Sequence, residues 1–248
     1  MKFSVTRSSS LLLLLLCGSA QAGIFDDPEN LEVLPEDISA QELGATMRGF
    51  ALGLGLRCSN CHVGEEGQDL AEYDFASDEK ELKLKAREML KMVRAINKDF
   101  LDEIEEDHVQ VRCVTCHRGV KEPKLLGQVL AEAAEEEGSA AIRETYFALK
   151  EQYYGSHSYD FSESGLGTIV RNWGEGRDPA ETTALLDLML EEHPQSFMAH
   201  FMYGEMERES GNTASAISYY QKALELNPQA IFIQRRLEQL QQETVGSE

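Results

Sequence analysis

The sequence carries one short pattern twice: two cysteines separated by two residues and followed directly by a histidine. The residues are Cys58, Cys61 and His62 in the first copy, and Cys113, Cys116 and His117 in the second. Two thiols one helical turn apart can each form a thioether bond with one vinyl group of a haem, and the adjacent histidine can then bind the iron. The two copies therefore predict two covalently bound haem c groups, held by the four cysteines, with the two histidines as iron ligands.

Two other interpretations of the cysteine pairs have to be weighed. Two C-x-x-C pairs could clamp one Zn²⁺, or each pair could form a disulfide. Neither arrangement needs a histidine directly after the second cysteine, yet both pairs have one. The pattern therefore favours haem attachment.

The first 22 residues have the features of a secretory signal peptide. Lys2 and Arg7 are basic, residues 11–16 are six leucines in a row, and residues 20–22 read Ala-Gln-Ala, a cleavage site of small residues. We therefore expect export to the periplasm. Cys17 is not expected to carry a lipid, because a leucine precedes it where a lipobox has a small residue. No other segment is apolar enough for a transmembrane helix.

The chain is strongly acidic, with 44 Asp and Glu against 23 Lys and Arg and a formal net charge of −21. Such a surface repels nucleic acid, so no nucleic-acid partner is expected. It attracts proteins with basic docking surfaces and speeds their encounter at low salt. The expected partners are therefore basic redox proteins, although a need for solubility alone explains many of the acidic residues.

The region before the first cysteine pair is expected to be an extended arm followed by a helix. Residues 23–38 are polar and form the arm. Ser39 and Glu42 have the spacing of a capping box, which predicts that a helix begins there. Gly53 and Gly55 near its end could let the backbone approach a porphyrin closely, or could simply stop the helix.

A second, longer helix is predicted over residues 78–105, opened by a capping box at Asp78 and Glu81. Its apolar residues recur at helical spacing: Leu82, Ala86, Met89, Val93, Ile96 and Phe100. This helix leads back to the second cysteine pair. Residues 39–123 therefore form a predicted dihaem cytochrome module.

Each iron also needs a sixth ligand, and methionine sulfur would close the site and raise the potential. Met47, on the helix before Cys58, is the candidate for the first haem. Met89 and Met92, one turn apart on the long helix, are the candidates for the second. Methionine on such helices also serves as ordinary core packing, so spacing alone does not choose between the two.

The remainder, residues 124–248, is expected to be helical and to contain repeats. Helices are predicted at 125–136, 139–153, 163–173, 179–192, 196–209, 213–226 and 229–243. Pro194 and Pro228 lie 34 residues apart, which is the tetratricopeptide period. This predicts units at about 161–194 and 195–228, with 229–243 as an end helix. Because independent stability usually needs three repeats, we expect these helices to pack on 125–153 or on the haem module. The predicted fold class is all-α.

Residues 39–123 resemble the cytochrome subunit of the photosynthetic reaction centre. The resemblance lies in residues 75–78, 86–97 and 111–119, which read FASD, AREMLKMVRAIN and VRCVTCHRG. In that family a helix carries methionine and the chain returns as C-x-x-C-H. The resemblance implies Met47 as a ligand of the first haem and selects Met89 above Met92 for the second. Familiar members carry four haems, and their additional histidine ligand has no equivalent in residues 98–104.

The expected function is that of a periplasmic dihaem c-type cytochrome, which carries electrons between redox partners and is not an enzyme. One alternative is a dihaem redox enzyme, such as a peroxidase, in which one haem keeps an open position. Another is a haem-bearing docking protein, whose tetratricopeptide-like half binds a protein partner.

Overall fold

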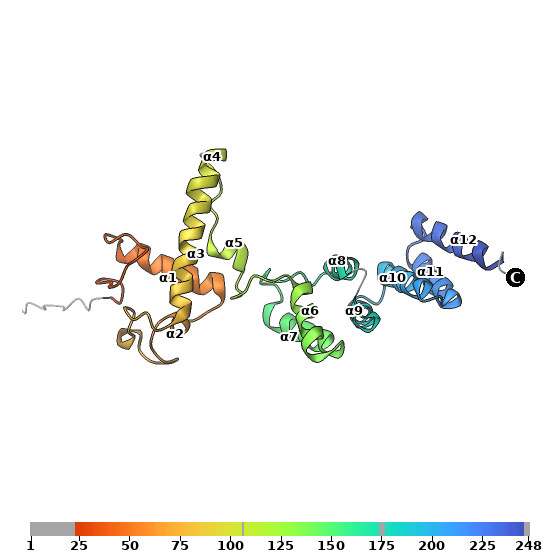
Figure 1. Ribbon diagram of the computed structural model, residues 1–248, viewed down its shortest axis with the longest axis horizontal. Helices are drawn as coiled ribbons and strands as arrows, with labels where there is room; N and C mark the ends of the chain where they lie inside the picture. Colours follow the sequence, from red (N-terminus) through yellow and green to blue (C-terminus); the bar gives the residue numbers. More distant parts are fainter. Residues whose placement is uncertain (1–22, 106, 174–176, 246–248) are drawn as a thin grey trace, which may run out of the picture. The chain divides into compact units, whose positions relative to one another are not determined.

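The computed structural model describes residues 23–105, 107–173 and 177–245, and its regular elements are helices (Figure 1). Within those ranges there is no strand, only an isolated β-bridge between Val63 and Asp74. The prediction of an all-helical chain is confirmed. In the described part of the chain, no helix is both long enough and apolar enough to cross a membrane.

The chain divides into two compact units. The first comprises the described parts of Met1–Gly49 and Arg57–Gln110, and the second comprises Phe50–Leu56 and the described parts of Val111–Glu248. The first cysteine pair therefore belongs to the first unit, and the second pair belongs to the second. The predicted border near residue 123 stays a prediction.

The first unit begins with the arm, which has no helix or strand over residues 23–38, as predicted. Helix α1 (Ala40–Leu54) follows, and the predicted capping box is present at its start. The Ser39 backbone N–H donates to the Glu42 carboxylate at 3.2 Å, and the Glu42 N–H donates to the Ser39 hydroxyl at 3.2 Å. These bonds satisfy N–H groups that have no partner inside the helix.

The long helix differs from its prediction at its start and near its end. Helix α3 spans Glu81–Ala95, continues as the π-helical segment η2 (Ile96–Leu101), and finishes as α4 (Asp102–Ile104). The predicted start at residue 78 and its capping box are wrong. The Asp78 carboxylate forms ion pairs with Lys83 and Arg87 instead of capping the helix. Between the first cysteine pair and α3, the only regular element described is the short 3₁₀ helix η1 (Leu70–Glu72).

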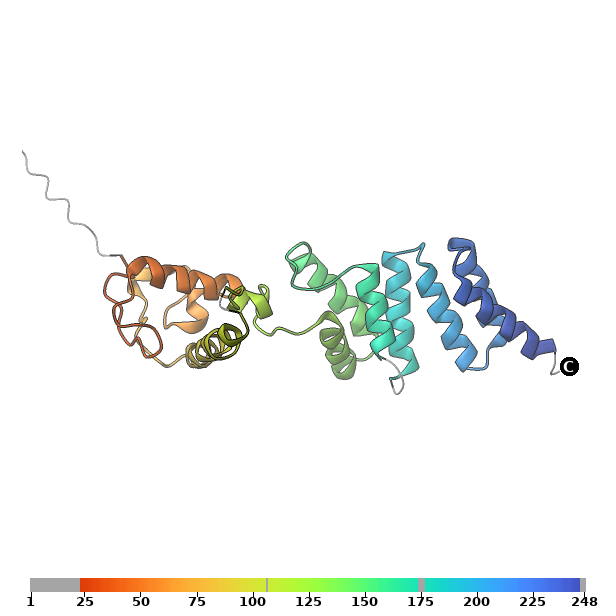
Figure 2. The same ribbon diagram turned by 90° about the horizontal axis from the view of Figure 1, so that it is seen from above.

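In the second unit, the seven helices predicted after residue 124 are all present, and their ends agree within two residues. They are α6 (Leu126–Glu137), α7 (Ala140–Tyr153), α8 (Glu163–Trp173), α9 (Pro179–Glu192), α10 (Phe197–Glu209), α11 (Thr213–Leu226) and α12 (Ile231–Val245). Figure 2 shows them as successive antiparallel neighbours, coloured green to blue. One core joins buried Leu130 and Tyr146 of α6 and α7 to Leu166 and Leu185 of α8 and α9. Helices α8 and α9 therefore pack on residues 125–153, as expected, whereas α11 and α12 form a second buried cluster around Tyr220 and Ile233.

The helix starts repeat at a fixed interval. Helices α8, α10 and α12 begin at residues 163, 197 and 231, and α9 and α11 begin at 179 and 213, so equivalent starts are 34 residues apart. At Gly204 of α10, an added Cβ would lie 2.5 Å from the ring of Tyr220 on α11, so only glycine fits there. The interval agrees with the tetratricopeptide period, and the assignment itself stays a prediction.

Candidate functional site

The first cysteine pair forms a one-turn helix, α2 (Cys58–Cys61). The Arg57 backbone N–H donates to the Asn60 side-chain oxygen at 2.9 Å, and the His62 N–H donates to the Cys58 carbonyl at 2.9 Å. Residues three apart on a helix lie on the same face, so both thiols point from one turn. The thiols are free.

His62, the predicted iron ligand that follows, is held beside an aromatic ring. The centroids of the His62 and Phe75 rings are 4.9 Å apart in an edge-on arrangement. Burial lowers the pKa of the His62 imidazole, and the positive charges of Lys83 and Arg87 lower it further. A neutral imidazole is the form that binds a metal. Among the described residues, its buried Nδ1 atom receives no hydrogen bond of good geometry.

The second cysteine pair repeats this local structure. Helix α5 spans Cys113–His117, and the Arg112 N–H donates to the Thr115 hydroxyl at 3.0 Å, as the Arg57 N–H does to Asn60. The Nδ1 atom of His117 is 3.1 Å from the Val120 carbonyl. An Nδ1–H donated to that carbonyl orients the ring and leaves Nε2 free to bind iron.

The polar residue in the third position of each motif was not singled out from the sequence. Asn60 and Thr115 both accept a hydrogen bond from the backbone of the arginine that precedes the first cysteine. Each side chain thereby satisfies an N–H group at the start of a helix only one turn long. The sequence signal was weak, because the third helical position of a capping box usually holds Glu or Gln.

Gly53 and Gly55 allow two segments of the backbone to approach each other closely. The Gly53 carbonyl accepts a hydrogen bond from the Gly119 N–H at 2.9 Å. A Cβ at Gly53 would lie 3.1 Å from the Cβ of Cys113, and a Cβ at Gly55 would collide with the Gly119 carbonyl oxygen. In this structure the two glycines let the end of α1 lie directly against the second cysteine motif.

Replacing Gly55 with alanine should therefore destabilise the second unit. Gly55 has φ +66°, and its missing Cβ leaves room for the Gly119 carbonyl. Backbone strain and the collision together should reduce the free energy of unfolding by about 2 kcal/mol. Gly49→Ala in the preceding helix α1 is the control, because a Cβ there meets nothing within 4 Å. Urea unfolding would contradict the assignment if both variants behaved alike.

The candidate methionines lie on α1 and α3. Met47 is half-buried in α1. The side chains of Met89 and Met92 are 46% and 48% exposed. With Leu84 they line a hollow of about 830 Å³ on one face of α3. The structure thus brings Met89 and Met92 together on α3, whereas His117 belongs to the other unit.

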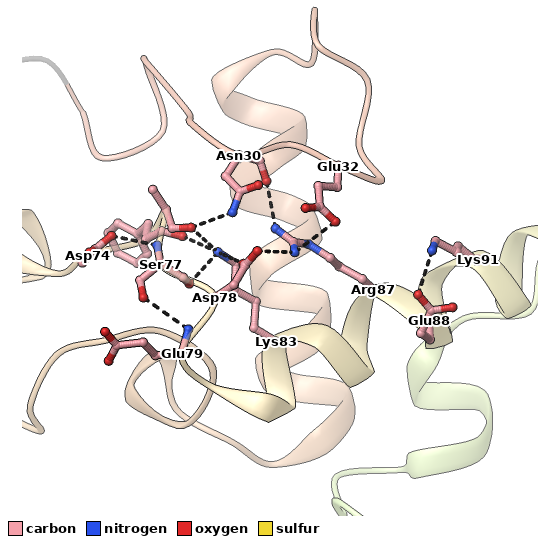
Figure 3. Close-up of polar contacts among 12 residues, drawn as sticks. Asn30, Glu32, Asp74, Ser77, Asp78, Glu79, Lys83, Arg87, Glu88 and Lys91 are labelled. Atoms are coloured by element: carbon pink, nitrogen blue, oxygen red, sulfur yellow. Dashed lines mark hydrogen bonds and ion pairs between the residues drawn. The ribbon is translucent and has the colours of Figure 1, made fainter.

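Charged groups also surround α3, and two of them, Arg87 and Glu32, line the same hollow as the methionines. The sequence pattern did not predict this. Lys83 is only 9% exposed. Its ammonium group donates to three backbone carbonyls, of Phe75, Ala76 and Ser77, at 2.9, 2.9 and 2.8 Å. It also pairs with the Asp78 carboxylate at 2.9 Å (Figure 3). Lys83 therefore holds residues 75–78, the segment that precedes α3, in place through these four contacts.

Arg87, one turn further along α3, is 7% exposed. Its guanidinium group bonds the Asp78 carboxylate at 2.9 Å, the Asn30 carbonyl at 3.0 Å and the Glu32 carboxylate at 3.2 Å (Figure 3). Hydrogen bonds from Arg87 and Lys83 hold the pKa of the Asp78 carboxyl far below its usual range. We call these five residues, Asn30, Glu32, Asp78, Lys83 and Arg87, the ion cluster. It fastens the arm to α3.

The residues present suit haem c. Each motif offers two free thiols on one turn of helix, followed directly by an imidazole. Among the described residues, Nδ1 of His62 has no partner of good geometry, and Nδ1 of His117 faces the Val120 carbonyl. The hollow on α3 exposes thioether and aliphatic side chains, whereas soluble helices normally bury such residues. A flat apolar group would cover them. Cys58, Cys61, Cys113 and Cys116 would attach the two groups, and His62 and His117 would bind the irons.

Comparison with known proteins assigns the family. The family model of the photosynthetic reaction centre cytochrome C subunit matches residues 22–181. The chain belongs to this family. The photosynthetic reaction center cytochrome c subunit of Thermochromatium tepidum is 34% identical over 98 residues, which cover 39% of this chain and 22% of that protein. The chain thus matches about a fifth of the length of this relative.

Membership of the reaction centre cytochrome family implies a c-type cytochrome that binds haem c and carries electrons. The cysteine pairs at 58–61 and 113–116 are consistent with two such haems. The match also extends further than the resemblance found at residues 39–123. It runs to residue 181, through α6, α7 and α8 and into the start of α9. The helices directly after residue 123 are therefore part of the family match.

Proposed function

We propose that this chain is a periplasmic dihaem c-type cytochrome that passes electrons between protein partners, with each iron closed by histidine and methionine. The observation that carries the proposal is the pair of one-turn helices, α2 and α5, with free thiols and an adjacent histidine, in a chain of the reaction centre cytochrome family. A bound haem supplies one-electron chemistry. The protein supplies attachment, orientation of the ligands and exclusion of water.

The residues of each motif have distinct parts in this proposal. The cysteines attach the cofactor, so it cannot be lost in an exported protein. His117 keeps its orientation through the Val120 carbonyl, and His62 through the ring of Phe75. Met47 closes the first site and Met89 the second. Methionine ligands favour electron transfer over chemistry on a small molecule, because they leave no open position.

The proposed location and partners rest on the sequence. The signal peptide over residues 1–22, and Cys17 within it, lie outside the described residues, and the family faces the periplasm. The net charge of −21 favours partners with basic docking surfaces. The helices repeating every 34 residues over 161–243 support a tetratricopeptide-like array, which could bind a further protein. No nucleic-acid partner is proposed.

The test is to count the haems and their attachment sites. The chain should be produced with the machinery that attaches haem c, and its absorption spectrum recorded after denaturation, when only covalent haem stays with the protein. We expect two haems per chain. Replacing Cys58 and Cys61 together by serine should remove one, and replacing Cys113 and Cys116 should remove the other. Stoichiometric zinc without visible absorption would overturn the proposal, and carbon monoxide binding by both reduced haems would contradict two closed irons.

A further inference from the structure

The ion cluster lies beside the first haem motif, and none of its residues is assigned to haem attachment or iron ligation. We infer that it has an electrostatic role: its buried cations raise the reduction potential of the first haem, and its lysine positions the His62 ligand through Phe75. This inference rests on the proposed function, since it presupposes a haem at Cys58 and Cys61. It makes Lys83 and Arg87 positioning and tuning residues, with Asp78 as their counter-charge.

A continuous set of contacts joins the cluster to His62. The Lys83 ammonium donates to the Phe75 carbonyl at 2.9 Å, and the ring of the same phenylalanine packs edge-on against the His62 ring at 4.9 Å between centroids. Lys83 lies 21 positions after His62 in the sequence, but in the structure both residues contact Phe75. The backbone of Phe75 is therefore fixed by the lysine, while its side chain fixes the imidazole.

Within the ion cluster, the two positive side chains are more buried than their negative partners. The side chains of Lys83 and Arg87 are 11% and 9% exposed. Their carboxylate partners are more open, with Asp78 at 36% and Glu32 at 59% exposure. Water screens an exposed charge more than a buried one, so the two cations are not fully compensated. This happens in a chain whose net charge is −21.

The arm shields these cations from water. The Asn30 side-chain amide donates to the Ala76 carbonyl at 2.7 Å, while the Asn30 carbonyl accepts from Arg87 at 3.0 Å. The residue adopts a left-handed backbone with φ 59° to make both bonds. Placing the arm here lowers the local dielectric constant, which strengthens the field of Lys83 and Arg87 at the neighbouring site.

The sign of the effect follows from the charge on the iron. Reduction removes one positive charge from the iron, and nearby cations favour the less positive state. Lys83 and Arg87 should therefore raise the potential of the first haem, and Asp78 and Glu32 should lower it. A purely structural cluster predicts something different: removing any member would loosen the same contacts, and the sign of the removed charge would not matter.

The experiment is a spectroelectrochemical titration of the full-length dihaem protein and its variants. Lys83→Met removes a cation of similar length, and Asp78→Asn removes the carboxylate between the two cations. We expect Lys83→Met to shift one of the two potentials downward and Asp78→Asn to shift the same potential upward. Because Arg87 also lines the hollow beside Met89, the shifted potential is assigned to the first haem by repeating the titration with Cys113 and Cys116 both replaced by serine. Lys83→Arg should restore the wild-type potential.

A third variant keeps the test decisive if the buried substitutions impair folding. Glu32→Gln changes an exposed side chain 3.2 Å from Arg87, so it should fold normally and shift the same potential upward, by less than Asp78→Asn. Shifts of the same sign for Lys83→Met and Asp78→Asn, or no shift with Glu32→Gln and Asp78→Asn, would overturn the inference. Absence of haem from Cys58 and Cys61 in the wild type would instead overturn the proposed function.

Discussion

Replacing Met89 with alanine is expected to let one of the two reduced haems bind carbon monoxide, whereas the same change at Met92 should leave both closed. A haem iron that loses its thioether ligand has an open position, and a small gas can occupy it. Both side chains are about half exposed and line the same hollow, so access does not distinguish them. The distinction comes from the resemblance to the reaction centre cytochrome subunit, in which the first methionine of the pair is the ligand.

Met92→Ala is a matched control, because it removes the same side chain one turn away with nearly the same exposure. The oxidised protein gives a second measurement. The absorption band at the red edge that reports a methionine–iron bond should weaken by half in Met89→Ala and stay unchanged in Met92→Ala. The reverse pattern would make Met92 the ligand. Unchanged spectra in both variants would show that neither methionine binds the iron.

Much of the helical half could be predicted because its signals are local. Helix α11 begins at Thr213 after Gly211 and Asn212, and it ends at Leu226 just before Pro228. Such start and stop residues act within a few positions of the chain, so the sequence alone contains them. The same is true of the capping box at Ser39 and of the cysteine motifs.

The surroundings of α3 could not be predicted in this way. The same kind of capping pattern at Asp78 suggested a helix start, but its carboxylate instead binds Lys83 and Arg87. These cations are buried because Asn30, 57 positions before Arg87, lies over them and accepts a hydrogen bond. Helical periodicity treats lysine and arginine as exposed, and it has no information about a distant segment that covers them.

The contact that Gly55 makes could not be predicted from the sequence either. The sequence places Gly55 near the end of a predicted helix, where glycine commonly stops a helix. The structure adds that the Gly119 carbonyl, 64 positions later, occupies the space of its missing Cβ. A contact of this kind depends on how two remote segments meet. Only the tertiary structure distinguishes a glycine that ends a helix from one that admits a neighbour.

The largest stability change is expected from Tyr220→Ala in the helical half. The Tyr220 side chain is fully buried in the cluster formed with Ala216, Ala223 and Ile233. Its ring occupies the space left by Gly204, so alanine would leave a cavity that the glycine cannot fill. Removing a large buried ring typically costs about 4 kcal/mol. Urea unfolding followed by circular dichroism measures this loss.

Tyr220→Phe separates the ring from its hydroxyl. That hydroxyl donates to the Glu205 carboxylate, which also pairs with Arg208 and Arg236 and so keeps other partners. The phenylalanine variant should therefore lose only about 1 kcal/mol. Because α10–α12 contain none of the haem-motif residues, both variants should attach two haems and keep the wild-type spectra. Equal losses for alanine and phenylalanine would contradict this packing, since the ring would then contribute nothing beyond its hydroxyl.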